Sequence, residues 1–299
     1  MFRKLKRYLC DPYYEIGSDL LKFCPKLMSD KWWIAALWNK IYGYKLDWDN
    51  PRTFNEKLQW LKLHVHNPLY TTLVDKLSVK NWVSEKIGVQ YIVPTLAVYH
   101  STDEINVDTL PDQFVLKCNH DSSSAIICKD KSSFDLSSAK RKLEKSLMCN
   151  YYWDSREWPY KNVKPCIIAE KLLVDNSSTI LTDYKFWCFN GEPKIMYCCV
   201  KNDNVWENYY DMDFNPLDIN HGYPRCSTQI NRPQNFDRMK DLARQLAINI
   251  PFIRIDFYEV NGQVYFGEFT FYDYAGFRPF ATKEQELMLG KMIDLSNCK

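Results

Sequence analysis

Three absences limit what this chain of 299 residues can do. Its formal net charge is only +2, so it lacks the strong basic field that nucleic-acid-binding proteins use, and we expect no nucleic acid among its partners. It has no apolar run of about 18 residues and no signal-peptide pattern, so we expect neither a transmembrane helix nor export. It also has no Cys-x-x-Cys pair, so we do not expect a structural zinc site.

Cysteine itself is abundant, at 11 residues, but the number is odd. Most of the cysteines lie inside apolar, strand-like runs, as Cys118, Cys128, Cys188 and Cys198 do. We interpret them as reduced thiols in the core of a cytoplasmic protein. The basic segment at residues 1–9 could contact the inner face of a membrane, but a solvated terminal helix is the favoured interpretation.

The rest of the composition is that of a soluble globular protein, with 46% hydrophobic and 25% charged residues. Helical patterns alternate with hairpin patterns, which predicts an α+β architecture with antiparallel sheets. Thr53 and Glu56 form a capping-box pattern that begins a helix at Phe54. We expect a second helix over residues 69–86 and an exposed loop over residues 151–158.

The most informative stretch is the hairpin Phe252–Tyr272, which turns at Asn261-Gly262. Asp256 and Glu268 lie at similar distances from this turn, on opposing strands that are otherwise mostly apolar. If they face one another they repel, and Mg²⁺, which prefers oxygen ligands, would remove the repulsion. A half-exposed edge hairpin with its charges on the wet face is the simpler alternative.

A second hairpin carries the serine loop, residues 121–124, which contains Ser122, Ser123 and Ser124 and no glycine. Backbone N–H groups of such loops can bind phosphates, and Lys117 on the preceding strand could supply positive charge. A surface hairpin with a solvated lysine explains the same residues.

Two further patterns carry candidate chemistry. Asp183 and Lys185 lie on one face of a strand that turns at Asn190-Gly191, because strand side chains alternate. Asp211-Met-Asp213 is an Asp-x-Asp pattern that could hold a metal and a sugar diphosphate, as in a glycosyltransferase, although such patterns are common by chance in polar loops.

In this order, the motifs resemble the ATP-grasp superfamily, and within it the polysaccharide-biosynthesis family typified by teichuronopeptide biosynthesis. The resemblance runs from about Asn50 to Phe280 and rests on seven motifs: Asn50–Lys62, Leu73–Lys76, Asp112–His120, Ile168–Lys171, Asp183–Phe186, Phe189–Pro193 and Gly267–Tyr272. It implies that ATP is held between two antiparallel sheets. It also implies a helical extension (1–50), an N-terminal α/β subdomain (51–112), a small lid subdomain (113–172) and a C-terminal catalytic subdomain (173–299).

The resemblance also implies roles for individual residues. Lys117 and the serine loop would contact phosphates, and Glu170, Lys171 and Leu173 resemble the hinge that contacts adenine. Relatives have a glycine-rich phosphate loop, so the serine loop departs from the family pattern, and a non-catalytic nucleotide-binding protein is an alternative.

The other implied roles belong to the reacting end of ATP. Asp183 and Lys185 resemble the pair that supplies a cation near phosphate or substrate. Arg254 would stabilise the transition state, and Asp256, Glu268 and Thr270 would form the Mg²⁺ site, with threonine where many relatives have asparagine. The implied activity is an ATP-dependent ligase that joins the carboxylate of a saccharide or lipid-linked saccharide, such as a uronic acid, or of an amino acid, to an amino acid or amine.

Overall fold

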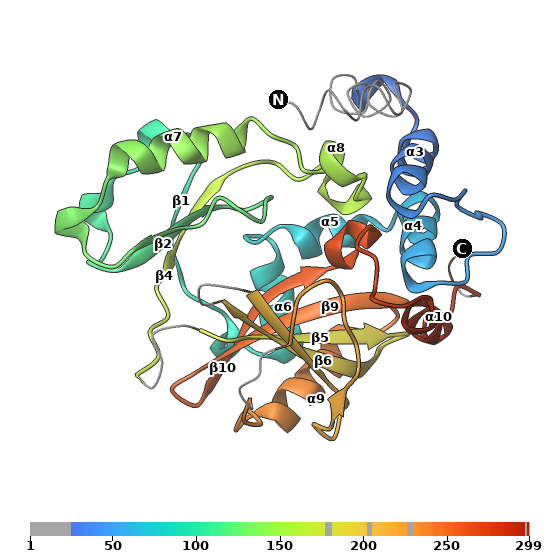
Figure 1. Ribbon diagram of the computed structural model, residues 1–299. Helices are drawn as coiled ribbons and strands as arrows, with labels where there is room; N and C mark the ends of the chain where they lie inside the picture. Colours follow the sequence, from blue (N-terminus) through green and yellow to red (C-terminus); the bar gives the residue numbers. More distant parts are fainter. Residues whose placement is uncertain (1–24, 177–180, 202–204, 226–229, 297, 299) are drawn as a thin grey trace, which may run out of the picture.

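The protein is described by a computed structural model for residues 25–176, 181–201, 205–225, 230–296 and 298 (Figure 1). The basic segment at residues 1–9 lies outside the described residues. Within them, the chain forms two antiparallel sheets with helices around both, which confirms the α+β prediction. None of the described helices is long and apolar enough to cross a membrane.

The first helices lie together at one end of the molecule (Figure 1). Helix α3 (Asp30–Tyr42) is followed by α4 (Phe54–His64), whose predicted capping box is present. The Thr53 hydroxyl accepts a hydrogen bond from the Glu56 N–H (3.2 Å), and the Glu56 carboxylate accepts one from the Thr53 N–H (2.9 Å). The C-terminal helix α10 (Lys283–Met292) packs against α4.

The single helix expected over residues 69–86 was wrong. The structure has α5 (Pro68–Val74) and α6 (Val79–Ile87), separated by a turn. The Asp75 carboxylate accepts hydrogen bonds from the Leu77 N–H (2.9 Å) and the Ser78 hydroxyl (2.7 Å). A short polar side chain that bonds nearby backbone competes with helical hydrogen bonding, which is why the helix breaks here.

The smaller sheet has the strand order β1-β4-β2-β3. Helix α7 (Leu136–Leu147) covers one of its faces, and the serine loop joins β2 to β3 (Figure 1). Strand β1 (residues 95–99) hydrogen-bonds to β4. It therefore belongs to this sheet, although it precedes residue 113, where the resemblance implies that the lid subdomain begins. The strands are β1 (Thr95–Tyr99), β2 (Phe114–Cys118), β3 (Ile126–Cys128) and β4 (Ile167–Lys171).

The larger sheet has the strand order β10-β9-β5-β6-β7-β8. Its hairpins turn where the sequence predicts, and Asn190, Gly191, Asn261 and Gly262 all have the positive φ that a tight turn requires. The strands are β5 (Asp183–Phe189), β6 (Glu192–Lys201), β7 (Val205–Tyr210), β8 (Pro216–Leu217), β9 (Phe252–Val260) and β10 (Gln263–Thr270).

The two faces of the larger sheet differ in character. One face packs against α9 (Phe236–Leu246), for example through Phe186 and Phe236, whose ring centroids are 5.8 Å apart. On the opposite face, Phe54 of α4 stacks on Trp187 (5.3 Å), next to the charged residues of β5 and β9. The short helices are α8 (Tyr152–Ser155) and the 3₁₀ segments Pro25–Leu27, Val89–Tyr91, Thr102–Glu104, Val107–Thr109, Lys131–Ser133, η6 (Trp158–Tyr160) and η7 (Asp273–Gly276).

The expectation of an exposed loop over residues 151–158 was also wrong. The segment contains α8, and Tyr152, Ser155, Arg156 and Glu157 are buried. The Tyr152 hydroxyl donates to the Asp30 carboxylate (2.6 Å), so α3 covers this segment. Cys118, Cys128, Cys188 and Cys198 are free and buried, as expected of thiols in the core.

Candidate nucleotide and metal site

Glu170 on β4 is the centre of the charged face of the smaller sheet. Its carboxylate lies 2.6 Å from Nζ of Lys117 on β2 and 2.5 Å from Nζ of Lys80 on α6. Burial favours the neutral form of Glu170, but the two lysines outweigh it and hold its pKa below the ordinary value. Lys117 is therefore not a solvated lysine on a wet face but one of two cations on a buried carboxylate.

The serine loop is held by its own acidic residue. The Ser124 hydroxyl accepts from the Cys118 N–H (2.8 Å) and donates to the Asp121 carboxylate (2.5 Å). Ser122 and Ser123 are exposed, whereas Ser124 is buried. Asp121 thus points into its own loop, and Ser122 and Ser123 are the predicted phosphate contacts with free access.

Lys76 connects the serine loop to the larger sheet. Its Nζ donates to the backbone carbonyl of Asp121 (2.6 Å) and lies 3.5 Å from the Glu268 carboxylate. The Lys76 N–H also donates to the Asn119 carbonyl (2.9 Å). The phosphate-loop candidate and the metal-ligand candidate are thereby brought to the same place.

On the larger sheet, β5 and β9 place Lys185 directly opposite Asp256. The Asp256 carboxylate accepts hydrogen bonds from Nζ of Lys185 and from Nε (2.7 Å) and Nη2 (2.9 Å) of Arg254. Asp183 lies 3.6 Å from Lys185, on the same face as predicted. Burial raises the pKa of Asp256, and the positive charges of Arg254 and Lys185 act in the opposite direction.

Glu268 reaches the same cluster because β10 has an irregularity opposite Asp256. The strand register shifts between Phe266 and Phe269, and Gly267 lies so close to β9 that an added Cβ would be 3.1 Å from the Asp256 carbonyl oxygen. Burial opposes ionisation of Glu268, but Lys76, Arg254 and other cations outweigh it and lower its pKa to about 2. Glu268 is therefore ionised at neutral pH.

Arg254 has a third acidic partner that the sequence did not reveal. Its Nη1 donates to the carboxylate of Asp273 (2.6 Å), and its Nη2 lies 3.2 Å from Glu268. Asp273 is fully buried and also accepts from Nε1 of Trp187 (3.2 Å). Arg254 is therefore held in one orientation by three carboxylates.

These residues fit Mg²⁺ by the chemistry of their oxygen donors. Mg²⁺ is usually held by one or two carboxylates together with substrate phosphates, and Asp256 and Glu268 supply two carboxylates. Within the described residues there is no group of three or more His, Cys, Asp or Glu side chains arranged to hold a metal alone. Thr270 pairs with Arg254 across the β9–β10 ladder and remains a predicted ligand.

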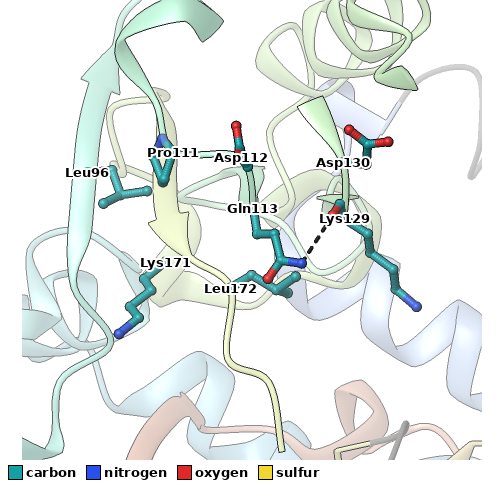
Figure 2. Close-up of a pocket in the computed structure, with 8 residues that line it drawn as sticks. All are labelled: Leu96, Pro111, Asp112, Gln113, Lys129, Asp130, Lys171 and Leu172. Atoms are coloured by element: carbon teal, nitrogen blue, oxygen red, sulfur yellow. Dashed lines mark hydrogen bonds between the residues drawn. The ribbon is translucent and has the colours of Figure 1, made fainter. Parts of the chain in front are cut away.

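Two of the three hinge residues, Lys171 and Leu173, follow Glu170 at the end of β4. Lys171 and Leu172 line a pocket of about 750 Å³ (Figure 2). Its other lining residues include Asp112 and Gln113, which directly precede β2 at the end opposite the serine loop. The pocket therefore lies away from the cation cluster, and the roles of Glu170, Lys171 and Leu173 in binding adenine stay predictions.

Sequence reasoning missed Lys76, Lys80 and Asp273 as site residues. Lys76 belongs to a motif quoted for the resemblance, and Asp273 follows directly after the predicted hairpin, so both had a weak signal. Lys80 had only its place in a helical pattern. None of the three could be assigned a partner before the fold was known.

The Asp-x-Asp pattern has a structural explanation. The Asp211 carboxylate accepts from the N–H groups of Asp213 (2.9 Å) and Asn215 (2.8 Å) and from the Asn215 side chain (2.9 Å). Asp211 thus shapes the turn between β7 and β8.

Comparisons with known proteins assign the family. The family model described as "TupA-like ATPgrasp" matches residues 56–294. A search of curated proteins finds no match.

Solved structures with a similar chain course include three ATP-grasp proteins. D-alanine–D-alanine ligase from Bacillus anthracis complexed with ATP has a TM-score of 0.41 and 16% identity, over 74% of this chain and 65% of that one. The ATP-grasp ligase PsnB with minimal precursor, Mg and ADP has a TM-score of 0.39 and 8% identity, and the match covers 73% of this chain and 57% of that one. A RimK domain ATP-grasp protein from Sphaerobacter thermophilus has a TM-score of 0.40 and 8% identity, and the match covers 75% of this chain and 69% of that one.

The matched region covers less than two thirds of the full length of several such ligases, for example 57% of the chain in another structure of D-alanine–D-alanine ligase from Bacillus anthracis. The family match itself covers most of the sequence and contains every charged residue of the site described above. The chain belongs to the TupA-like ATP-grasp family, with the ATP-grasp fold.

Proposed function

We propose that this protein is an ATP- and Mg²⁺-dependent carboxylate–amine ligase. The observation that carries the proposal is the meeting of three cations at Asp256 and Glu268. Lys76 lies at the serine loop, Lys185 and Arg254 lie on the larger sheet, and all three contact one of these carboxylates. Clustered cations around two candidate metal ligands are the arrangement that phosphoryl transfer requires.

Lys117, Lys80 and Lys185 would hold phosphate oxygens. In the structure each of the three is neutralised by a carboxylate, Glu170 for the first two and Asp256 for Lys185. Phosphate oxygens compete for the same N–H donors, so nucleotide binding replaces internal ion pairs rather than creating a new charged site. Ser122 and Ser123 would add hydrogen bonds from the loop.

Asp256 and Glu268, with Thr270, would hold Mg²⁺, which supplies charge neutralisation for the phosphates when bound. Arg254 would stabilise the charge that develops on the transferring phosphoryl group. Its three carboxylate partners fix the guanidinium before any substrate arrives, so little reorganisation is needed at the moment of reaction.

The reaction that we propose is the one usual in the ATP-grasp superfamily. A substrate carboxylate oxygen forms a bond to the γ-phosphorus as the bond to ADP breaks, which gives an acyl phosphate. An amine then forms a bond to the acyl carbon, phosphate leaves, and the amine loses a proton. We propose a uronic acid of a saccharide or lipid-linked saccharide, or an amino acid, as the carboxylate, and an amino acid or amine as the nucleophile, in surface-polysaccharide assembly.

Organisation and location are part of the same proposal. We propose that residues 51–112, 113–172 and 173–299 act as the three ATP-grasp subdomains behind the helical extension 1–50, in a cytoplasmic protein that works at or near the inner face of the membrane.

The test is a product assay by mass spectrometry. The protein is incubated with Mg²⁺ and either ATP or UDP-sugars, in the presence of uronic acids and amines. ADP, phosphate and an amide product support the ligase, whereas UDP release with unchanged ATP supports a glycosyltransferase. If neither nucleotide shifts the melting temperature, a non-catalytic role replaces both.

Asp256→Asn is the sharper variant. It should abolish Mg²⁺-dependent turnover because Asn cannot replace the charge of a metal ligand. Circular dichroism and the elution volume should match those of the wild type, since Asn keeps the shape of the side chain. Retained turnover would remove Asp256 from the site.

A further inference from the structure

Helix α4 carries a row of buried polar side chains that the proposed function does not use. Asn55, Gln59 and Lys62 are spaced four and three residues apart, so they lie on one face of the helix, and each is at most 1% exposed. Buried polar groups of this kind are kept only where they make hydrogen bonds. All three donate to backbone carbonyls of one loop, residues 275–278.

The individual contacts are short. The Gln59 Nε2 donates to the carbonyls of Gly276 (2.6 Å) and Ala275 (3.1 Å). The Lys62 Nζ donates to the carbonyls of Ala275 (2.7 Å) and Ser155 (2.8 Å). Asn55 binds the carbonyl of Arg278 (2.9 Å). The loop is thus fixed to α4 at three points.

The loop has an unfavourable backbone conformation. Tyr274 (φ 46°, ψ 37°) and Ala275 (φ 53°, ψ 19°) are both left-handed, and Gly276 follows with φ 63°. A non-glycine residue in this region is strained, and such strain persists only where the surrounding structure enforces it. At Gly276 an added Cβ would lie 2.6 Å from Nε2 of Gln59 and 3.0 Å from Cβ of Leu58, so a larger residue would displace the Gln59 side chain from its contacts.

The residue before this strained turn is Asp273, whose carboxylate binds Nη1 of Arg254. We propose that Gln59 and Lys62 are positioning residues for Arg254: they hold the left-handed turn Tyr274–Gly276, and the turn holds Asp273 against the guanidinium. The proposal rests on the proposed role of Arg254 in phosphoryl transfer. The motif Asn50–Lys62 lies outside both sheets, and by this proposal it contacts Arg254 indirectly, through the turn Tyr274–Gly276 and Asp273.

Lys62 is suited to this task because its surroundings prevent it from turning to solvent. Burial lowers its pKa to about 7, and the negative charge of buried Glu157 acts in the opposite direction. Its ammonium lies 4.5 Å from the centre of the Phe277 ring and 5.5 Å from that of Tyr272, on either side of the strained turn. Loss of Lys62 would remove the donor to the Ser155 carbonyl and one of the two α4 donors to the Ala275 carbonyl, and it would take a nearby positive charge from Glu157.

Lys57 offers a matched control on the same helix. Its Nζ donates to the carbonyl of Ile293 (2.6 Å), beyond α10, so Lys57→Met removes the same kind of contact without touching the loop. Lys62→Met is the test variant. Lys62→Met combined with Glu157→Gln keeps the buried site neutral and serves if the single variant does not fold.

The first measurement does not depend on catalysis. In protein labelled with ¹⁵N-arginine, the Arg254 Nε–H resonance is assigned by its loss in Arg254→Lys. Lys62→Met should shift or broaden this resonance, and Lys57→Met should leave it in place. An unchanged resonance in Lys62→Met and in the double variant overturns the proposal.

The second measurement is turnover. Lys62→Met should lower kcat by roughly tenfold to a hundredfold, since misplacing a catalytic group by about 1 Å can cost that much. The KM for ATP should stay unchanged, because Arg254 acts on the transition state. Equal loss in Lys57→Met would mean that Lys62 only stabilises the fold and would overturn the proposal. If the wild type has no turnover, the ligase proposal fails, and the Arg254 resonance still decides the link.

Discussion

The buried carboxylate of Asp273 accepts a 2.6 Å hydrogen bond from Nη1 of Arg254, nineteen residues earlier in the chain. The contact joins the strained turn η7 to strand β9, and it adds a third carboxylate to a guanidinium that already binds Asp256 and Glu268. Arg254 therefore enters any reaction with its orientation fixed by protein groups.

Replacing Asp273 should reveal how much that orientation matters. Asp273→Asn keeps a hydrogen-bond acceptor but removes the charge, and hydrogen bonds to charged groups contribute about 1.5–3 kcal/mol. We expect kcat to fall on the order of tenfold to a hundredfold with little change in the KM for ATP. Steady-state kinetics measure this. Asp218→Asn, at a side chain that is 96% exposed, is the control and should behave as wild type. Wild-type kcat in Asp273→Asn would contradict the prediction.

Lys117→Met should weaken nucleotide binding. The lysine would exchange Glu170 for phosphate oxygens, so its loss removes a charge-assisted contact and lowers ATP affinity roughly tenfold or more. Titration calorimetry with Mg²⁺ and a non-hydrolysable ATP analogue measures the affinity. Lys291→Met, at an exposed position on α10, changes the same charge outside both sheets and should have no effect. Equal affinities for both variants would exclude a phosphate contact by Lys117.

Replacing the buried serine of the serine loop should lower the unfolding free energy, whereas replacing an exposed one should not. Ser124→Ala leaves the Cys118 N–H without an acceptor and frees Asp121, which should cost about 1–3 kcal/mol of unfolding free energy. Ser122→Ala, at an exposed position, should change stability by less than about 0.5 kcal/mol. Urea denaturation followed by circular dichroism compares them. A loss in Ser122→Ala as large as in Ser124→Ala would show that the loop is not held as described.

The fully buried His221 should make stability depend on pH. Burial lowers its pKa from 6.5 to about 4, against the opposing charge of Asp273, whose carboxylate lies 3.7 Å from Nδ1. The unfolded chain therefore binds more protons between pH 4 and 6.5, so the unfolding free energy rises with pH there and is lost as pH falls from 6.5 towards 4.

This contribution should amount to no more than about 3 kcal/mol. His221→Gln should flatten the slope of unfolding free energy against pH over that interval, and urea denaturation at several pH values measures it. Parallel slopes in the two proteins would mean that carboxylates alone cause the dependence.

The local elements of this fold were predictable from the sequence because short-range physics determines them. The Thr53–Glu56 capping box, the Asn261-Gly262 turn and the shared face of Asp183 and Lys185 each depend on residues within a few positions of one another. The order of such motifs was also enough for the resemblance, and the family model confirms it.

Other features depend on contacts between distant parts of the chain. Asp75 interrupts a helical pattern through its local hydrogen bonds to Leu77 and Ser78, and only the fold adds Asn119, 44 residues away, as a further partner of its carboxylate. Residues 151–158 are polar and aromatic, which suggests exposure, but α3 and α4 bury them. No local pattern predicts the Asn119 contact or this burial.

The hairpin Phe252–Tyr272 has both kinds of feature, those determined locally and those that depend on distant contacts. By itself the sequence determined its turn and placed Asp256 and Glu268 on opposing strands. Only the tertiary structure decided their partners, Lys185 from β5 and Lys76 from the turn before α6. It also brought Asp273 to Arg254, from a loop that α4 holds in a strained conformation. Charge partners are selected by proximity in three dimensions, and proximity between distant segments exists only once the core has packed.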